Sequence, residues 1–169
     1  LDIFSIASGF LLRAVAGIAA GALPSSPWFL LSVGLLALFL AIEKRKAELR
    51  LSIERGFFTR EVLKRYSLPL LLRLEGLVST SSFITYSLWA SGPLLGGANS
   101  SWMMLTIPFV LIGIFRYQLL SDPEESQRRK ELNPDHASEK PEEILLSDRG
   151  IKLTLLSWLG TVVIVGFLI

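Results

Sequence analysis

Residues 28–50 read WFLLSVGLLALFLAIEKRKAELR, an uncharged apolar run followed at once by a dense run of charge. A helix that crosses the hydrocarbon core needs about 20 mostly apolar residues, because the core is about 30 Å thick and each residue rises about 1.5 Å. Residues 28–42 nearly meet that length, and the helix can extend through Ser25 at one end while Lys44 and Arg45 snorkel at the other. This stretch predicts a membrane-spanning helix whose charged end continues beyond the lipid.

Four other stretches have the same apolar character, at residues 3–22, 68–90, 102–120 and 151–169. Their apolar runs are continuous instead of alternating, which favours helices over the strands of a barrel. We therefore expect an all-α fold, a polytopic transmembrane helix bundle with five spans. No internal repeat is evident, and residues 1–169 should belong to a single membrane-embedded domain.

The composition supports solvation by lipid and excludes several classes of protein. Hydrophobic residues make up 51% of the chain and the mean hydropathy is +0.52, which is too apolar for a soluble domain. The chain has no cysteine, so it has no disulfide, thiolate nucleophile or cysteine-bound metal. The formal charge is only +2, and basic residues gathered beside apolar spans suit anionic lipids or phosphates better than nucleic acid.

Nearly all of the charge lies on one side of the predicted bundle. Of the 17 basic residues, only Arg13 and Arg73 lie outside residues 43–65 and 116–152. Linkers rich in Lys and Arg stay cytoplasmic, which predicts that the N-terminus is cytoplasmic and the C-terminus lies on the opposite side. The chain opens at Leu1 in an apolar stretch without a basic leader, so we expect no signal peptide and a fragment of a longer protein.

Arg13 is a candidate binding residue because it interrupts the first span. Gly9 and Gly17 flank it at one helical turn on either side, a spacing that lets helices approach closely. A charge at that depth costs at least about 2.5 kcal/mol, so Arg13 should face the bundle interior and an anion. That anion can be a ligand, or a carboxylate on a helix outside this chain.

The run from Glu43 to Arg50 allows a structural and a functional interpretation. In a helix Lys44 and Glu48 share a face, and Arg45 is also adjacent to Glu48. The run can be no more than the basic flank of a span, stabilised by a Lys44–Glu48 pair. It can also form a basic floor for phosphates, with Glu48 holding a divalent cation or orienting a ribose hydroxyl.

Two further basic residues stand at the ends of predicted spans. Arg116 ends the fourth span, in which Pro108 should kink the helix. Arg116 can bind a phosphate, or it can simply extend its charged end from the lipid to the membrane surface. Ser147 or Asp148 should cap the last helix. Because a helix N-terminus attracts anions, Arg149 beside it can add to a phosphate site.

Two polar stretches are interpreted as structural. The third span contains Arg73, Glu75 and a hydroxyl-rich patch over residues 79–85, which can hold helices together. Residues 121–143 are polar, contain proline and show no periodicity, so they should form a mobile loop. His136, the only histidine, lies there without a second ligand, and we do not expect it to bind metal.

Four phrases of the sequence resemble the UbiA-type membrane prenyltransferase superfamily, and within it the branch that transfers phosphoribose to decaprenyl phosphate. They are LDIFSIASGFLLRAVAG (residues 1–17), LALFLAIEKRKAEL (36–49), IPFVLIGIFRYQLL (107–120) and PEEILLSDRG (141–150). The resemblance implies nine helices around a cavity open to the cytoplasmic side and to lipid, of which this chain would supply helices five to nine. Where aromatic prenyltransferases carry an aspartate-rich second motif, this chain reads KRKAEL, a departure that favours the phosphoribosyl branch.

The resemblance implies transfer of 5-phosphoribose from phosphoribosyl pyrophosphate to a polyprenyl phosphate, with Mg²⁺ as cofactor, at the cytoplasmic side of the bacterial inner membrane. The superfamily's first aspartate-rich motif has no match here, so this chain should be inactive alone. The implied partners are the two substrates and membrane lipids, and not nucleic acid. The implied site consists of Glu48 as catalytic residue and metal ligand, and of Arg13, Lys44, Arg45, Arg116 and Arg149 as ligands of the substrates.

Two other functions remain open from the sequence. One is a prenyltransferase that uses an isoprenoid diphosphate and an aromatic acceptor; the lack of a second aspartate motif argues against it. The other is part of a transporter or scaffold whose charges only set the topology. Carboxylates in the rest of the protein would separate these interpretations.

Overall fold

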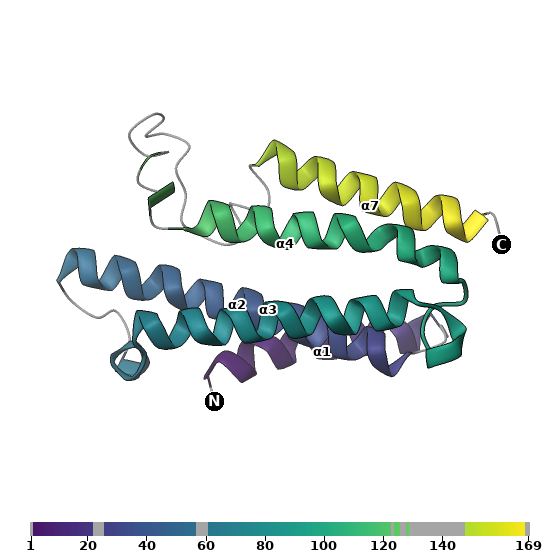
Figure 1. Cartoon of the computed structure of the whole chain (residues 1–169). Coiled ribbons are helices and arrows are strands. Elements are labelled where there is room, and N and C mark those ends of the chain that lie inside the picture. The colour runs from purple at the N-terminus through teal and green to yellow at the C-terminus, as the bar shows by residue number, and fades with distance from the viewer. Residues whose placement is uncertain are drawn as a thin grey trace. The chain divides into compact units, whose positions relative to one another are not determined.

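The computed structural model describes residues 2–21, 26–56, 61–122, 124, 125, 128 and 148–167, and these residues form no strand. The long helices are α1 (Asp2–Ala20), α2 (Pro27–Arg55), α3 (Leu68–Ala90), α4 (Ile107–Ser121) and α7 (Arg149–Phe167) (Figure 1). Short 3₁₀ helices cover η1 (Glu61–Arg65), η2 (Pro93–Leu95) and η3 (Ser101–Thr106). The prediction of an all-α fold is confirmed.

Four helical segments are long and apolar enough to span a membrane: Asp2–Ala20, Pro27–Arg55, Ser101–Ser121 and Arg149–Phe167. The fifth predicted span, α3, has the predicted bounds and 23 residues but is not among them. Its interior carries Arg73, Glu75 and the hydroxyl-rich patch, which lower its hydropathy. The chain is an integral membrane protein.

The chain forms two compact units, Leu1–Ser101 and Trp102–Ile169. In the first unit α2 packs against both α1 and α3. Phe39, Ile42 and Leu71 are buried in this core. Within the hydroxyl-rich patch, Ser82 is buried and its hydroxyl donates to the carbonyl of Ser32 at 3.5 Å, as expected for a contact between helices.

The chain reverses tightly after α3, and two glycines make the turn possible. Gly92 adopts a φ of 96°, which side-chain-bearing residues rarely adopt. A Cβ at Gly97 would overlap the carbonyl oxygen of Trp89. The turn is joined to the start of α2, because the Ser26 hydroxyl donates to the Gly96 carbonyl at 2.7 Å. This end of the first unit is held together without charge.

In the second unit α4 packs against α7. Pro108, where the sequence predicted a kink, stands in the first turn of α4, directly after η3. A first-turn proline disturbs no helical hydrogen bond, since its missing N–H would have no partner inside the helix. The Thr106 hydroxyl donates to the Met103 carbonyl at 2.6 Å, and the proline marks the change from 3₁₀ to α geometry.

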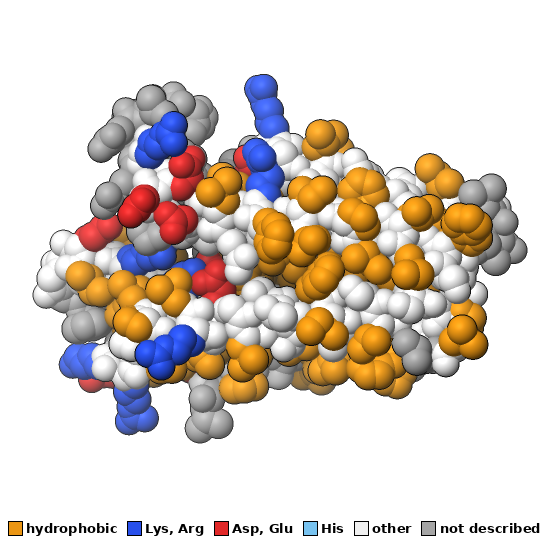
Figure 2. All heavy atoms as spheres, in the orientation of Figure 1, with side chains coloured by type: hydrophobic (Ala, Val, Ile, Leu, Met, Phe, Trp, Pro, Cys, Tyr) orange, Lys and Arg blue, Asp and Glu red, His pale blue; other side chains and the backbone are white. Residues whose placement is uncertain are grey.

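Hydrophobic side chains are spread along the helices on the face that Figure 2 shows. Phe4 and Leu12 on α1 are exposed, as are Leu153 and Leu156 on α7. A soluble protein rarely exposes so much contiguous apolar surface. These faces therefore suit contact with lipid or with other membrane helices.

Candidate functional site

The first charged cluster joins the start of α1 to the charged end of α2. The Arg45 guanidinium binds Asp2 through two hydrogen bonds, Nε to Oδ2 at 2.5 Å and Nη2 to Oδ1 at 2.9 Å. Its Nη1 donates to Oε2 of Glu48 on the same helix. All three guanidinium nitrogens therefore donate to a carboxylate. The Arg45 side chain is also buried, with only 2% of it exposed.

The second cluster joins α2 to α3 and consists of Glu43, Lys46 and Glu75. The Lys46 ammonium donates to Oε1 of Glu43 at 2.7 Å and also to Oε2 of Glu75. All three residues are buried. One ammonium is thus shared by two carboxylates, and the three residues fix the contact between the two helices. We refer to these three residues as the buried triad.

The sequence did not predict the buried triad or the part played by Asp2. Glu43 and Lys46 are three residues apart, the spacing of a helical ion pair, and this was the available signal. Glu75 is a carboxylate within a span and therefore needs a partner, but its partner is 29 residues away in the sequence. Only the packing of α3 on α2 identifies that partner.

The surface of the charged segment presents Lys44 and Glu48. Lys44 is exposed, and 23% of the Glu48 side chain is exposed. The sequence allowed a Lys44–Glu48 pair, but Glu48 binds Arg45 instead. Among the described residues no carboxylate lies within ion-pair distance of Lys44. Its ammonium is therefore available to an anion beside the Glu48 carboxylate.

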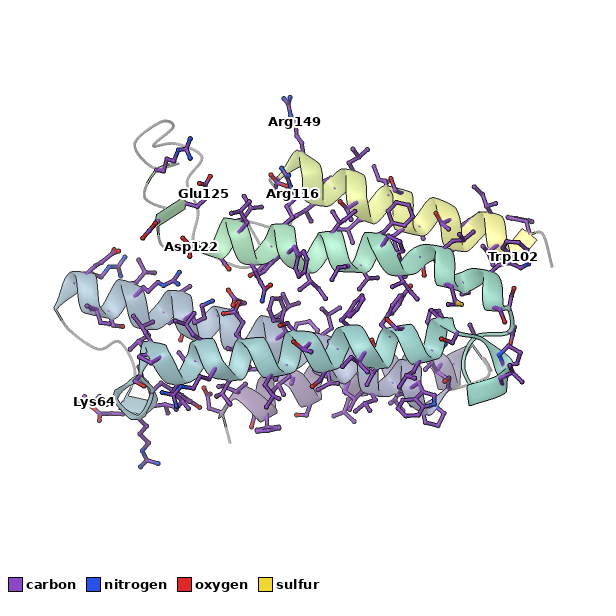
Figure 3. All side chains as sticks on the ribbon, viewed as in Figure 1. Lys64, Trp102, Arg116, Asp122, Glu125 and Arg149 are labelled. Atoms are coloured by element: carbon purple, nitrogen blue, oxygen red, sulfur yellow. The ribbon has the colours of Figure 1, made fainter. Side chains whose placement is uncertain are left out.

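In the second unit, Arg116 near the end of α4 meets the start of α7. Its Nε and Nη2 bind Oδ1 and Oδ2 of Asp148 at 2.6 and 3.0 Å. Asp148 Oδ1 also accepts the N–H of Ile151 at 2.7 Å, which confirms the predicted cap for Asp148; Ser147 lies outside the described residues. Arg149 is exposed beside this pair (Figure 3).

The Arg116 guanidinium holds the pKa of the Asp148 carboxyl below its ordinary value, mainly by hydrogen bonding. The hydrogen bond from Ile151 lowers the pKa further, while partial burial opposes both effects. Asp148 therefore stays ionised and keeps Arg116 beside the positive end of α7. Arg116, Arg149 and this helix end together form a basic region at the start of α7.

Arg13 is exposed within the first unit, and its guanidinium lies 5.6 Å from the centroid of the Phe10 ring. Side chains added at Gly9 and Gly17 would meet open space. Arg13 thus stands at the surface of the described part of its unit, and no described carboxylate lies within ion-pair distance of it. Its predicted role stays a prediction.

The described residues contain no group of three or more His, Cys, Asp or Glu side chains that could hold a metal ion. Glu48, the predicted ligand, already accepts a hydrogen bond from Arg45. The described residues therefore do not form a magnesium site on their own. His136 and nearly all of the predicted mobile loop at 121–143 lie outside the described residues.

These features define a class: an α-helical integral membrane protein with charged clusters near the ends of apolar helices. No family model matches the sequence. Over 96% of its length, however, the chain is 36% identical to a decaprenyl-phosphate phosphoribosyltransferase of Mycolicibacterium smegmatis. Proteins of the same name from Mycobacterium tuberculosis and Corynebacterium glutamicum are 34% and 28% identical to it.

The chain spans about half the length of these curated relatives, 49% of the first two and 47% of the third. The similarity itself runs through nearly the whole chain and therefore includes both units. Along nearly its whole length, the chain is therefore similar to one half of proteins named decaprenyl-phosphate phosphoribosyltransferase.

Proposed function

We propose that the protein containing this chain transfers 5-phosphoribose from phosphoribosyl pyrophosphate to a polyprenyl phosphate. The observation that carries the proposal is the similarity to decaprenyl-phosphate phosphoribosyltransferases along 96% of the chain. Apolar helix surfaces beside exposed cations suit an enzyme whose acceptor has a long hydrocarbon tail and a phosphate head.

The chemistry of this transfer fits cationic residues at a membrane surface. An oxygen of the lipid phosphate forms a bond to the anomeric carbon of ribose, and the bond from that carbon to pyrophosphate breaks. Pyrophosphate leaves with the bonding electron pair, and the sugar passes through a state with positive character. Because the lipid phosphate is already an anion, the attack needs no strong base, and catalysis rests on holding charges in place.

The accessible pair on α2 is proposed to bind the donor. Lys44 supplies an ammonium for a phosphate group, and Glu48 supplies a carboxylate for a ribose hydroxyl or, together with other ligands, a metal. The buried, fully engaged Arg45 supports this pair instead of contacting substrate. Arg116 and Arg149 are proposed to attract phosphate at the start of α7, and Arg13 to face an anion inside the complete bundle.

Magnesium is proposed as the partner of pyrophosphate. When bound, it would neutralise charge on the leaving group. Most of its ligands must come from outside the described residues, since these contain no sufficient cluster. The part of the relatives that this chain does not span is the proposed source.

The proposed location is a bacterial cell membrane, with the charged segments on the cytoplasmic side. The asymmetry of charge supports this orientation, because segments rich in Lys and Arg are retained in the cytoplasm. Phosphoribosyl pyrophosphate is a soluble anion, so a cytoplasmic donor site would give it direct access.

Membranes containing the full-length protein test the proposed function. They should convert labelled phosphoribosyl pyrophosphate and polyprenyl phosphate to a labelled lipid in a magnesium-dependent reaction. Matched membranes without the protein serve as the control. Failure to use this donor, together with prenylation of an aromatic acid, would show that the protein belongs to the other catalytic branch.

A further inference from the structure

The contacts of Arg45 suit a residue that positions its neighbours and not one that binds substrate. Its guanidinium is closed off by Asp2 on one side and by Glu48 on the other, and its side chain is 2% exposed. A phosphate could reach it only by displacing one of these carboxylates. The contact that sets the position of Arg45 from outside its own helix is the bidentate one with Asp2 on α1.

Whether Glu48 binds Arg45 or Lys44 decides whether the Lys44 ammonium can bind an anion. In a helix Glu48 can reach Arg45, three residues before it, or Lys44, four residues before it. The structure shows the first arrangement. While Glu48 stays with Arg45, the Lys44 ammonium is not neutralised by that carboxylate and can receive an anion. If Arg45 is released, Glu48 can turn to Lys44.

We propose that Asp2 is a positioning residue for the donor site: it anchors Arg45, which keeps Glu48 away from Lys44. The exposed ammonium and carboxylate then stay separate, one suited to a phosphate and the other to a sugar hydroxyl. This inference rests on the proposed function for its kinetic consequence. The contacts themselves are independent of that function.

The kinetic test uses the full-length protein in membranes. Asp2→Asn should raise KM for phosphoribosyl pyrophosphate about tenfold with a smaller change in kcat, and Asp2→Glu should restore most of the loss. Because Asp2 acts through Glu48, the double variant Asp2→Asn/Glu48→Gln should be no worse than Glu48→Gln alone. Additive losses would overturn the positioning role. Glu61→Gln, which breaks an exposed ion pair with Lys64, is the matched control and should leave KM unchanged.

A second measurement does not depend on activity. Phenylglyoxal modifies accessible arginines, and peptide mass spectrometry reports each site. Arg45 should be protected in the wild type and in Asp2→Glu but modified several-fold faster in Asp2→Asn, with exposed Arg149 as the internal reference. Equal protection of Arg45 in the wild type and in Asp2→Asn would overturn the proposal. If the protein transfers no phosphoribose, the proposed function is wrong, and this protection still decides whether Asp2 anchors Arg45.

Discussion

Gly150 lies directly against the guanidinium of Arg116, so a methyl group at position 150 would overlap it. The same guanidinium binds both carboxylate oxygens of Asp148, the N-cap of α7. The absence of a side chain at Gly150 therefore lets Arg116 reach the cap. Gly150 and Asp148 together determine where the guanidinium of Arg116 lies at the start of α7.

Gly150→Ala should displace the guanidinium of Arg116 from Asp148, so it should raise the Tm of the detergent-purified full-length protein less than Gly160→Ala does, or lower it. Gly160→Ala is the matched control, because it lies on the same helix with open space around it. Alanine favours a helix by about 1 kcal/mol over glycine, so the control should be neutral or stabilising. Equal shifts in both variants would contradict the contact.

The Asp148–Arg116 pair should stabilise the protein in a pH-dependent manner. The folded-state pKa of Asp148 lies below its unfolded value of about 3.9, so the stabilisation is present above that value and lost as pH falls through the folded pKa. Asp148→Asn removes the charge and keeps a good N-cap residue. The Tm difference between wild type and variant should be constant near neutral pH and shrink below about pH 4. A constant difference at acidic pH would argue against the ion pair.

Lys46→Met should destabilise the packing of α2 on α3. It leaves the buried carboxylates Glu43 and Glu75 without their shared cation, and breaking such a pair typically costs about 3–5 kcal/mol. Lys64→Met removes an exposed pair with Glu61 and should cost at most about 1 kcal/mol. Thermal unfolding of both variants in detergent provides the comparison. A small effect in both would show that the buried triad does not hold these helices together.

Arg13→Leu should reduce turnover strongly while insertion into the membrane stays normal or improves. The side chain is exposed in the described part of its unit, within an apolar span, and a charge in lipid is costly. An anion elsewhere in the complete protein would explain its presence. Activity assays and membrane fractionation measure the two effects separately. Unchanged activity would identify Arg13 as a tolerated charge without a binding role.

The sequence predicted the helices closely because each apolar run has or nearly has the length of a span and ends in charge, proline or glycine. The bounds of α3 match the prediction fully, and α2 continues past Ile42 to Arg55 as expected. The cap by Asp148 was also predictable, since its side chain acts on the next turn of its own helix. These features depend only on local sequence.

The contacts between helices were not predictable in the same way. Asp2 and Arg45 are 43 residues apart, and the rotation of α1 on α2 decides whether they meet. Helix geometry allows Glu48 to bind either Lys44 or Arg45, and only the burial of Arg45 against α1 selects between them. The resemblance implied that Arg45 binds substrate, and its contacts with Asp2 and Glu48 are the reason why we propose a supporting role instead.

The most direct test of the central claim is the rate of lipid labelling from phosphoribosyl pyrophosphate in membranes carrying the full-length protein. The wild type should form a labelled polyprenyl product, and Lys44→Ala and Glu48→Gln should each lower the rate at least about tenfold, or roughly 1.4 kcal/mol of transition-state stabilisation. Glu61→Gln should match the wild type. A wild-type protein that forms no labelled lipid would contradict the proposed transfer, and full activity in both site variants would contradict the proposed donor site.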